Sequence, residues 1–274
     1  TPEIFAMIDT ICSEDTFDVN PINGDPTVAT IVPSNTTYVW TVVDNPNVTG
    51  DSDEALPQTS ISQTLVNETN VTQDVVYTIT PISDLGCDGP TFELTVTVES
   101  RPIISDKIDG ICSGDTFTVT PTDNAPLEIV PTNTLYTWTV VPAADNAFVT
   151  GFSDVTVPTA PISQTLINLS DDVRIITYIV TPSSGTCIGL PFELEVTLSP
   201  RPFIEDVVVD PICSEDTFVV SPQTGVPNAN IVVPIGTTYT WTVVANPNVD
   251  GESDEIVPQT EISQTLTNTT SVTQ

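Results

Sequence analysis

The chain has 274 residues, with 37 acidic side chains, 4 basic ones, a formal net charge of −33 and no histidine. Four cations cannot supply the basic surface that nucleic acid or anionic lipid requires. The lack of histidine excludes Ser-His-Asp and Cys-His catalysis and any zinc site with histidine ligands. No apolar run approaches the ~18 residues of a membrane-spanning helix, so we expect no nucleic-acid partner and no membrane insertion.

The composition is typical of an all-β protein. Val, Ile and Thr are abundant, and 25 prolines interrupt the sequence at intervals. β-Branched residues suit pleated sheets and proline marks their ends and edges, whereas the good helix formers are scarce. We therefore expect almost no helix.

Alternating apolar and polar residues predict the strands of the first 100 residues. In chain order they span residues 3–9, 16–20, 37–43, 60–67, 75–80 and 91–98, and a polar stretch containing residues 50–54 joins the third to the fourth. Tyr38, Trp40 and Val42 share one face of the third strand. Trp40 is predicted to lie in the core, not to serve as an exposed sugar platform, and so are its counterparts Trp138 and Trp241. About seven short strands around a buried Trp indicate a Greek-key β-sandwich of immunoglobulin type.

The sequence repeats with a period of about 100 residues. Ile11-Cys12-Ser13 recurs at residues 111–113 and 212–214, and Ile-Ser-Gln-Thr-Leu occurs at residues 61–65, 162–166 and 262–266. We predict three tandem domains at residues 1–100, 101–200 and 201–274, arranged as an elongated rod, with the third truncated before its last two strands. Arg-Pro pairs at 101–102 and 201–202 mark short junctions without a flexible linker.

The combined motifs resemble a known family. Tyr38-x-Trp40-Thr41-Val42, Tyr77-Thr78-Ile79-Thr80-Pro81, Gly86-Cys87-x-Gly89 and the boundary Arg-Pro are similar to the PKD-like repeats of Bacteroidetes surface proteins, which include gliding-motility adhesins exported by type IX secretion. The resemblance covers the whole chain and implies a secreted, cell-surface location. The Phe-Gly-Asp-Gly that follows the Trp in many PKD domains is absent, so the role of that turn is not carried over.

Five cysteines in an acidic, secreted-looking chain indicate disulfides. Equal spacing allows one bridge inside each domain, Cys12–Cys87 and Cys112–Cys187, which leaves Cys213 unpaired. The predicted topology favours a different pairing, because Cys12 follows the first strand while Cys87 lies between the last two, at the opposite end of the sandwich. A disulfide needs Cα atoms within about 7 Å. Cys12 would then pair with Cys187 of the next domain, and both schemes remain open from the sequence.

Acidic side chains cluster at two equivalent places. Asp51, Asp53 and Glu54 recur as Glu252, Asp254 and Glu255, while the second repeat keeps only Ser153-Asp154 of this pattern. Carboxylates are calcium ligands, so a calcium site is one interpretation; a solvated, charged loop is the other. Calcium is the only cofactor that the sequence suggests.

No catalytic constellation is found, and we expect no enzyme. The leading hypothesis is a structural segment of a long surface filament or adhesin stalk, whose partners are neighbouring repeats and an unknown surface ligand at the tip. One alternative is a carbohydrate- or protein-binding accessory module of a secreted enzyme. Another, if Gln274 is a true C-terminus, is a filament subunit whose open third sandwich accepts a donor strand from a neighbour.

Overall fold

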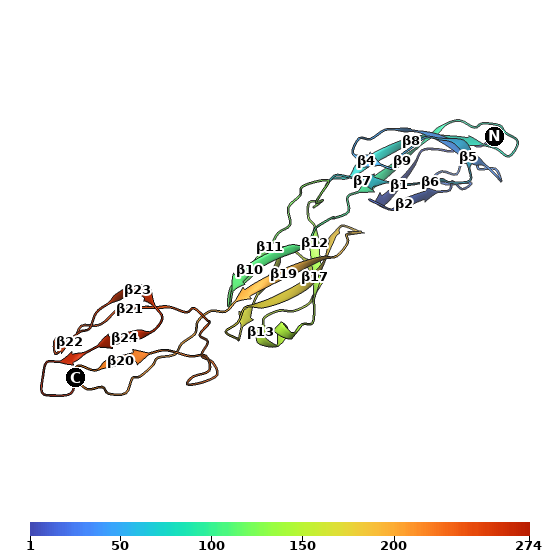
Figure 1. The fold of residues 1–274 in the computed structure, drawn as a ribbon. Helices are drawn as coiled ribbons and strands as arrows, with labels where there is room; N and C mark the ends of the chain where they lie inside the picture. Colours follow the sequence, from blue (N-terminus) through green and yellow to red (C-terminus); the bar gives the residue numbers. More distant parts are fainter.

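The computed structural model describes residues 1–274. The protein is all-β, with one short 3₁₀ helix, and its repeats follow one another along an elongated molecule whose termini lie at opposite ends (Figure 1). The tandem β-sandwich repeats expected from the sequence are confirmed.

The first repeat contains nine strands. They are β1 (Met7–Cys12), β2 (Thr16–Val19), β3 (Thr37–Val43), β4 (Val48–Thr49), β5 (Glu54–Gln58), β6 (Ile61–Thr64), β7 (Val66–Asn67), β8 (Gln73–Ile82) and β9 (Phe92–Glu99). One sheet has the order β1-β9-β8-β3-β5, and the strand pairs β2–β6 and β4–β7 complete the fold. The alternating apolar residues of β8 and β9 pack into a core of 14 buried residues.

The second repeat has the same architecture. Its elements are β10 (Lys107–Cys112), β11 (Thr116–Val119), β12 (Leu135–Val140), η1 (Ala144–Phe148), β13 (Val149–Thr150), β14 (Val155–Thr159), β15 (Ile162–Thr165), β16 (Ile167–Asn168), β17 (Arg174–Ser184), β18 (Cys187–Ile188) and β19 (Phe192–Ser199). Its main sheet runs β10-β19-β17-β12-β14, with β18 paired to β17. Its core also has 14 buried residues, so the duplication preserves packing as well as topology.

The third repeat has no counterparts of β8 and β9. It consists of β20 (Thr217–Val220), β21 (Tyr239–Trp241), β22 (Val249–Asp250), β23 (Glu255–Gln259), β24 (Ile262–Thr265) and β25 (Thr267–Asn268). Residues 208–213 correspond to β1 but form no strand, because the strand with which β1 pairs is missing. For the same reason Trp241 is only partly buried, whereas Trp40 and Trp138 are buried.

Two expectations about the first repeat were wrong in detail. The first strand spans Met7–Cys12, not residues 3–9, because it pairs in parallel with β9 in a register that sets Cys12 opposite Glu99. Cys12 therefore ends a strand instead of lying in a turn. The stretch after Gly50 was expected to be a polar connection, but Glu54–Gln58 forms β5, the edge strand beside β3.

A tight glycine turn precedes β5. Gly50 has φ +95°, in the left-handed region, and a Cβ at this position would lie 2.1 Å from the backbone oxygen of Thr64. Gly151 and Gly251 have the same conformation and the same close approach to Thr165 and Thr265. Only glycine lets the two backbones come so close, so this turn is a fixed feature of all three repeats.

Candidate functional site at the joint between repeats

A disulfide between Cys12 and Cys187 links the first two repeats, with a Cα–Cα distance of 5.5 Å and a sequence separation of 175 residues. Cys12 is the last residue of β1, and Cys187 is the first residue of β18 in the second repeat. The pairing within domains, Cys12–Cys87 and Cys112–Cys187, is absent from this structure. The cause is the parallel β1–β9 pairing, which brings Cys12 to the end of the sandwich that faces the next repeat.

An ion pair reinforces the same joint. The boundary residue Arg101 extends back to the first repeat, where its Nη2 lies 2.5 Å from Oδ1 of Asp15. Asp15 follows Cys12 by three residues, so the ion pair and the disulfide start from the same turn. Arg101 is 22% exposed and Asp15 50% exposed, and such a pair contributes at most about 1 kcal/mol. Its role is to orient the exit of the chain, more than to stabilise the fold.

Glu99 lies against the disulfide. Its Oε2 is 3.3 Å from Sγ of Cys187 and accepts a 3.5 Å hydrogen bond from the hydroxyl of Thr186. Cys12, Glu99 and Cys187 are the one group of three potential metal ligands whose atoms lie within 4.8 Å of one another. With both sulfurs in a disulfide, the group lacks the thiolates that a zinc site requires.

A polar cavity of about 370 Å³ spans the joint. Asn70, Val71, Thr72, Glu99 and Ser100 line it from the first repeat, and Pro131, Thr132, Ser184 and Gly185 line it from the second. Around this cavity the two sandwiches meet through loops, and the disulfide links them covalently. The Arg101–Asp15 pair orients the linker.

The next joint repeats half of this arrangement. Arg201 forms an ion pair of 2.9 Å with Asp115, and this contact raises the pKa of the guanidinium, with smaller contributions from Cys112. Cys112 occupies the place of Cys12, and the position that would correspond to Cys187 lies beyond Gln274, outside this sequence. Cys87, Cys112 and Cys213 are all exposed, free thiols.

The acidic residues proposed for calcium have structural partners instead of converging on one point. Asp53 Oδ1 accepts a 2.8 Å hydrogen bond from the amide of Val42, and Asp254 does the same for Val243. Asp154, the acid that the second repeat retains, bonds in this way to Val140. The shared aspartate thus caps the irregular edge where the third strand of each repeat meets its neighbour.

The other acidic residues are more local. Glu54 and Glu255 accept bonds from amides two residues further on, and Glu252 accepts one from the amide of Asn246. One carboxylate oxygen of Asp51 is buried without a hydrogen-bond partner. The pKa of Tyr77 is raised first by the burial of its own hydroxyl and second by the negative charge of Asp51. A calcium site at these residues stays a prediction.

The Ile-Ser-Gln-Thr-Leu motif holds the two sheets together. In the first repeat Gln63 donates to the backbone oxygen of Ser52 at 2.8 Å and accepts from the Tyr77 hydroxyl at 2.8 Å. Trp40 Nε1 donates to the same Ser52 oxygen at 3.0 Å. The motif that identifies the repeat therefore connects β6, the β5 turn and the core aromatics.

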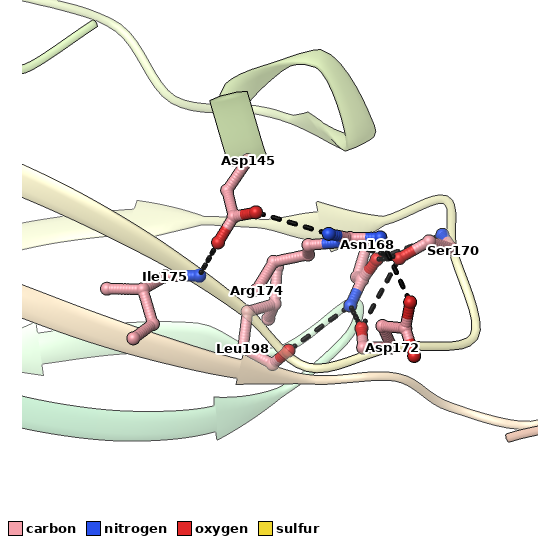
Figure 2. A network of polar contacts seen from close by, with 7 residues as sticks. All are labelled: Asp145, Asn168, Ser170, Asp172, Arg174, Ile175 and Leu198. Atoms are coloured by element: carbon pink, nitrogen blue, oxygen red, sulfur yellow. Dashed lines mark hydrogen bonds and ion pairs between the residues drawn. The ribbon is translucent and has the colours of Figure 1, made fainter. Parts of the chain in front are cut away.

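A buried asparagine closes each complete sandwich. Asn168 is 4% exposed, and its amide nitrogen donates to the backbone oxygens of Asp172 and Leu198, while Ser170 donates to its oxygen (Figure 2). Arg174 extends the network to Asp145, whose pKa is lowered by the amide of Ile175 and then by this guanidinium (Figure 2). Asn67 makes equivalent bonds in the first repeat, so neither of these Asn-x-Ser/Thr triplets is free to carry a glycan.

The third repeat has an apolar groove of about 620 Å³ where β8 and β9 would lie. Phe218, Val249 and Leu266 line it together with the cysteine-bearing segment 209–214. The corresponding residues of the first repeat, Phe17, Val48 and Leu65, are at most 3% exposed under their covering strands. The groove is the open core of an incomplete sandwich.

Sequence reasoning missed Asp15, Asp115 and Glu99. A signal was present for the two aspartates, because half of the chain's four cations are the arginines at the repeat boundaries, and each pairs with an aspartate 86 residues earlier. No local pattern pointed to Glu99, which is an ordinary outward residue of its strand until the second repeat approaches.

The chain has no helix long and apolar enough to cross a membrane.

Several solved structures resemble this chain distantly. A search of the curated proteins finds no match. Among solved structures, a surface-located SusE-like polysaccharide-binding protein of Bacteroides thetaiotaomicron matches at 12% identity over 73% of this chain and 34% of its own, with a TM-score of 0.29. A Photobacterium 2,6-sialyltransferase matches at 15% identity over 40% of this chain and 20% of its own, with a TM-score of 0.24.

Mouse cadherin-23 EC22-24 matches at 14% identity over 73% of this chain and 65% of its own, with a TM-score of 0.31. The chain covers about a third of the length of the polysaccharide-binding protein and a fifth of the length of the sialyltransferase. Likenesses this distant say nothing of what the chain binds.

The sequence matches one family model over almost its whole length. The PKD-like domain matches residues 9–102, 109–202 and 210–274, in three tandem copies. The chain belongs to the PKD-like domain family.

Proposed function

We propose that this chain is a non-catalytic segment of a long, secreted cell-surface filament or adhesin stalk, in which the repeats supply reach and stiffness. The observation that carries the proposal is the joint. Three connections tie the first two repeats: the linker, the Cys12–Cys187 disulfide and the Arg101–Asp15 pair. A second covalent link between sandwiches restricts their bending, which is of use to a stalk and of little use to independent binding modules.

The charge and the cysteines support an extracellular stalk. A net charge of −33 on 274 residues makes neighbouring rods repel one another, so they stay separate without a covering layer. Disulfides form and persist outside the cytoplasm. The motif set further favours, within the PKD-like family, the surface adhesins of Bacteroidetes exported by the type IX route, including those used in gliding motility.

Solution scattering tests the stiffness directly. The oxidised chain is expected to have one elongated shape with a narrow distribution of maximum dimensions, and reduction with a phosphine should broaden that distribution. Arg101→Ala, which keeps the disulfide, should broaden it less. A compact particle, or an oxidised distribution as broad as the reduced one, would contradict the proposal.

A binding role is the alternative that the same preparation can test. If the repeats form an accessory module, the oxidised chain should bind one class of polysaccharide on an array of immobilised glycans, saturably and with competition by the free sugar. A stalk segment gives no saturable signal. Saturable binding would replace the stalk proposal with the accessory one.

A second candidate, strand donation, applies where Gln274 is the C-terminus and the third repeat takes its missing strands from a neighbour. The first two repeats show which occupant fits the groove of the third: an antiparallel pair with the alternating apolar pattern of β8 and β9. A second copy of the chain could supply such a pair only by opening one of its own complete sandwiches. Dimers that form upon mild unfolding, and not in native solution, would identify this exchange.

A further inference from the structure

We infer that the Cys12–Cys187 bond is a mechanical shunt: when the chain is pulled by its ends, tension passes across this bond and residues 13–186 carry none of the covalent load. The inference deepens the proposed function, since it rests on a stalk being pulled, and it concerns what the joint does under tension. It follows from which strands the bond connects.

The first part of the load path is β1. Tension applied at the N-terminus runs along residues 1–12 and reaches Cys12, the last residue of this strand. β1 is an edge strand, paired in parallel with β9 over six residue pairs from Met7–Leu94 to Cys12–Glu99. Because β1 is pulled at both of its ends, it is tightened along its own axis instead of being peeled from the sheet.

The second part of the path is β19. From Cys187 the load passes through β18 and the short following loop into Phe192–Ser199, and then leaves toward the third repeat. β19 lies inside its sheet, hydrogen-bonded to β10 on one side and β17 on the other. Figure 1 shows β19 running along the second repeat toward the third. The strand that carries the load is therefore held by hydrogen-bonded neighbours on both of its edges.

Both parts of the path are β-strands, which are already close to full extension at about 3.3 Å per residue. Stretching them gains little length, so the first two repeats resist elongation without any need for strong cores. The remaining strands of both cores are attached beside the path, not within it. The linker at Arg101 is also bypassed, which leaves its ion pair with Asp15 free to set direction without bearing force.

Single-molecule force spectroscopy on the full chain measures this. The bond takes the segment between Cys12 and Cys187, a separation of 175 residues, out of the extensible length of the chain. At about 3.4 Å per extended residue, the oxidised chain should therefore end about 600 Å shorter than the chain treated with a phosphine reductant. In the oxidised state only the third repeat should contribute a large gain of length.

Two variants make the test specific. Cys12→Ser should show the full extension without reductant. Cys87→Ser is the matched control, because Cys87 is the counterpart of Cys187 in the first repeat and is free; it should extend like the unaltered oxidised chain. If Cys87→Ser instead gains about 250 Å, the bridges lie within the repeats, since Cys12 and Cys87 are 75 residues apart, and the shunt is overturned.

Reduction of the unaltered chain keeps the test valid even if Cys12→Ser folds poorly. Equal extension before and after reduction would also overturn the shunt. This failure differs from failure of the stalk: a rod-shaped particle in scattering with equal extensions refutes the shunt alone, whereas saturable glycan binding with a 600 Å difference refutes the stalk alone.

Discussion

The glycine turn before β5 leads to a quantitative prediction. Gly50→Ala places a Cβ 2.1 Å from the Thr64 backbone oxygen, at a φ of +95°. The left-handed backbone costs a side-chain-bearing residue about 1–2 kcal/mol. The clash adds about 1–3 kcal/mol, the usual cost of overpacking, because Thr64 is fixed at the end of β6 and cannot withdraw. We expect the first repeat to lose about 2–5 kcal/mol in its free energy of unfolding.

Gly24→Ala separates the two contributions. Gly24 has a similar φ of +87°, but a Cβ there meets nothing within 4 Å. This variant should therefore lose only the backbone part, about 1–2 kcal/mol. The difference between the two variants isolates the close approach of the chains.

Native-state hydrogen exchange is the suitable assay, because a chain of several domains does not unfold as one unit. Each 1.4 kcal/mol corresponds to a tenfold change in an equilibrium constant. The slowest amides of β6 and β8 should therefore lose about tenfold protection in Gly24→Ala and about 30-fold to 4,000-fold in Gly50→Ala. Amides of the second repeat should not change. Equal losses in the two variants would refute the steric explanation.

Three further predictions concern charge, the open groove and the thiols. The Lys107 and Ser105 side chains lower the pKa of Glu128, so its stabilising contribution is present above the unfolded pKa of 4.5 and is lost as the pH falls through the lowered pKa. Glu128→Gln should therefore flatten the dependence of second-repeat stability on acid pH, measured by hydrogen exchange. An unchanged dependence would exclude the effect. In a chain whose other two tryptophans are replaced by phenylalanine, a peptide of residues 73–99 should occupy the third-repeat groove and shift the fluorescence of Trp241 to shorter wavelength. A scrambled peptide should leave the fluorescence unchanged. Native alkylation without reductant, followed by mass mapping, should modify three of the five cysteines, and modification of all five would show the joint to be open; the three are Cys87, Cys112 and Cys213.

Much of the fold could be predicted because it follows from the alternation of apolar and polar residues along each strand. The alternation in β8 and β9 and the inward Trp40 depend on neighbours two residues apart, and the repeat length depends only on self-similarity. The start of β1 could not be predicted, since its register is set by β9, more than 80 residues away. β5 was missed because an edge strand beside a polar turn carries little of the usual apolar pattern.

The candidate site shows the same division between local and distant information. The equal cysteine spacing suggested bridges within domains, and the predicted strand order favoured Cys12–Cys187 instead, since the ends of a sandwich are too far apart for a disulfide to span. Asp15 and Glu99 acquire their roles only when the second repeat is in place, and nothing in their own neighbourhoods distinguishes them from other acids. Contacts between domains are thus the part that single-domain patterns cannot supply.

The parallel alignment of β1 with β9 also determines how such a protein can change its size. Since the first and last strands of a repeat point the same way, the chain enters each sandwich at one end and leaves at the other. Every copy then contributes its long dimension to the whole. A tandem gene duplication lengthens the molecule by a constant increment and creates no interface that must evolve anew, so length becomes a trait that can be adjusted by counting copies.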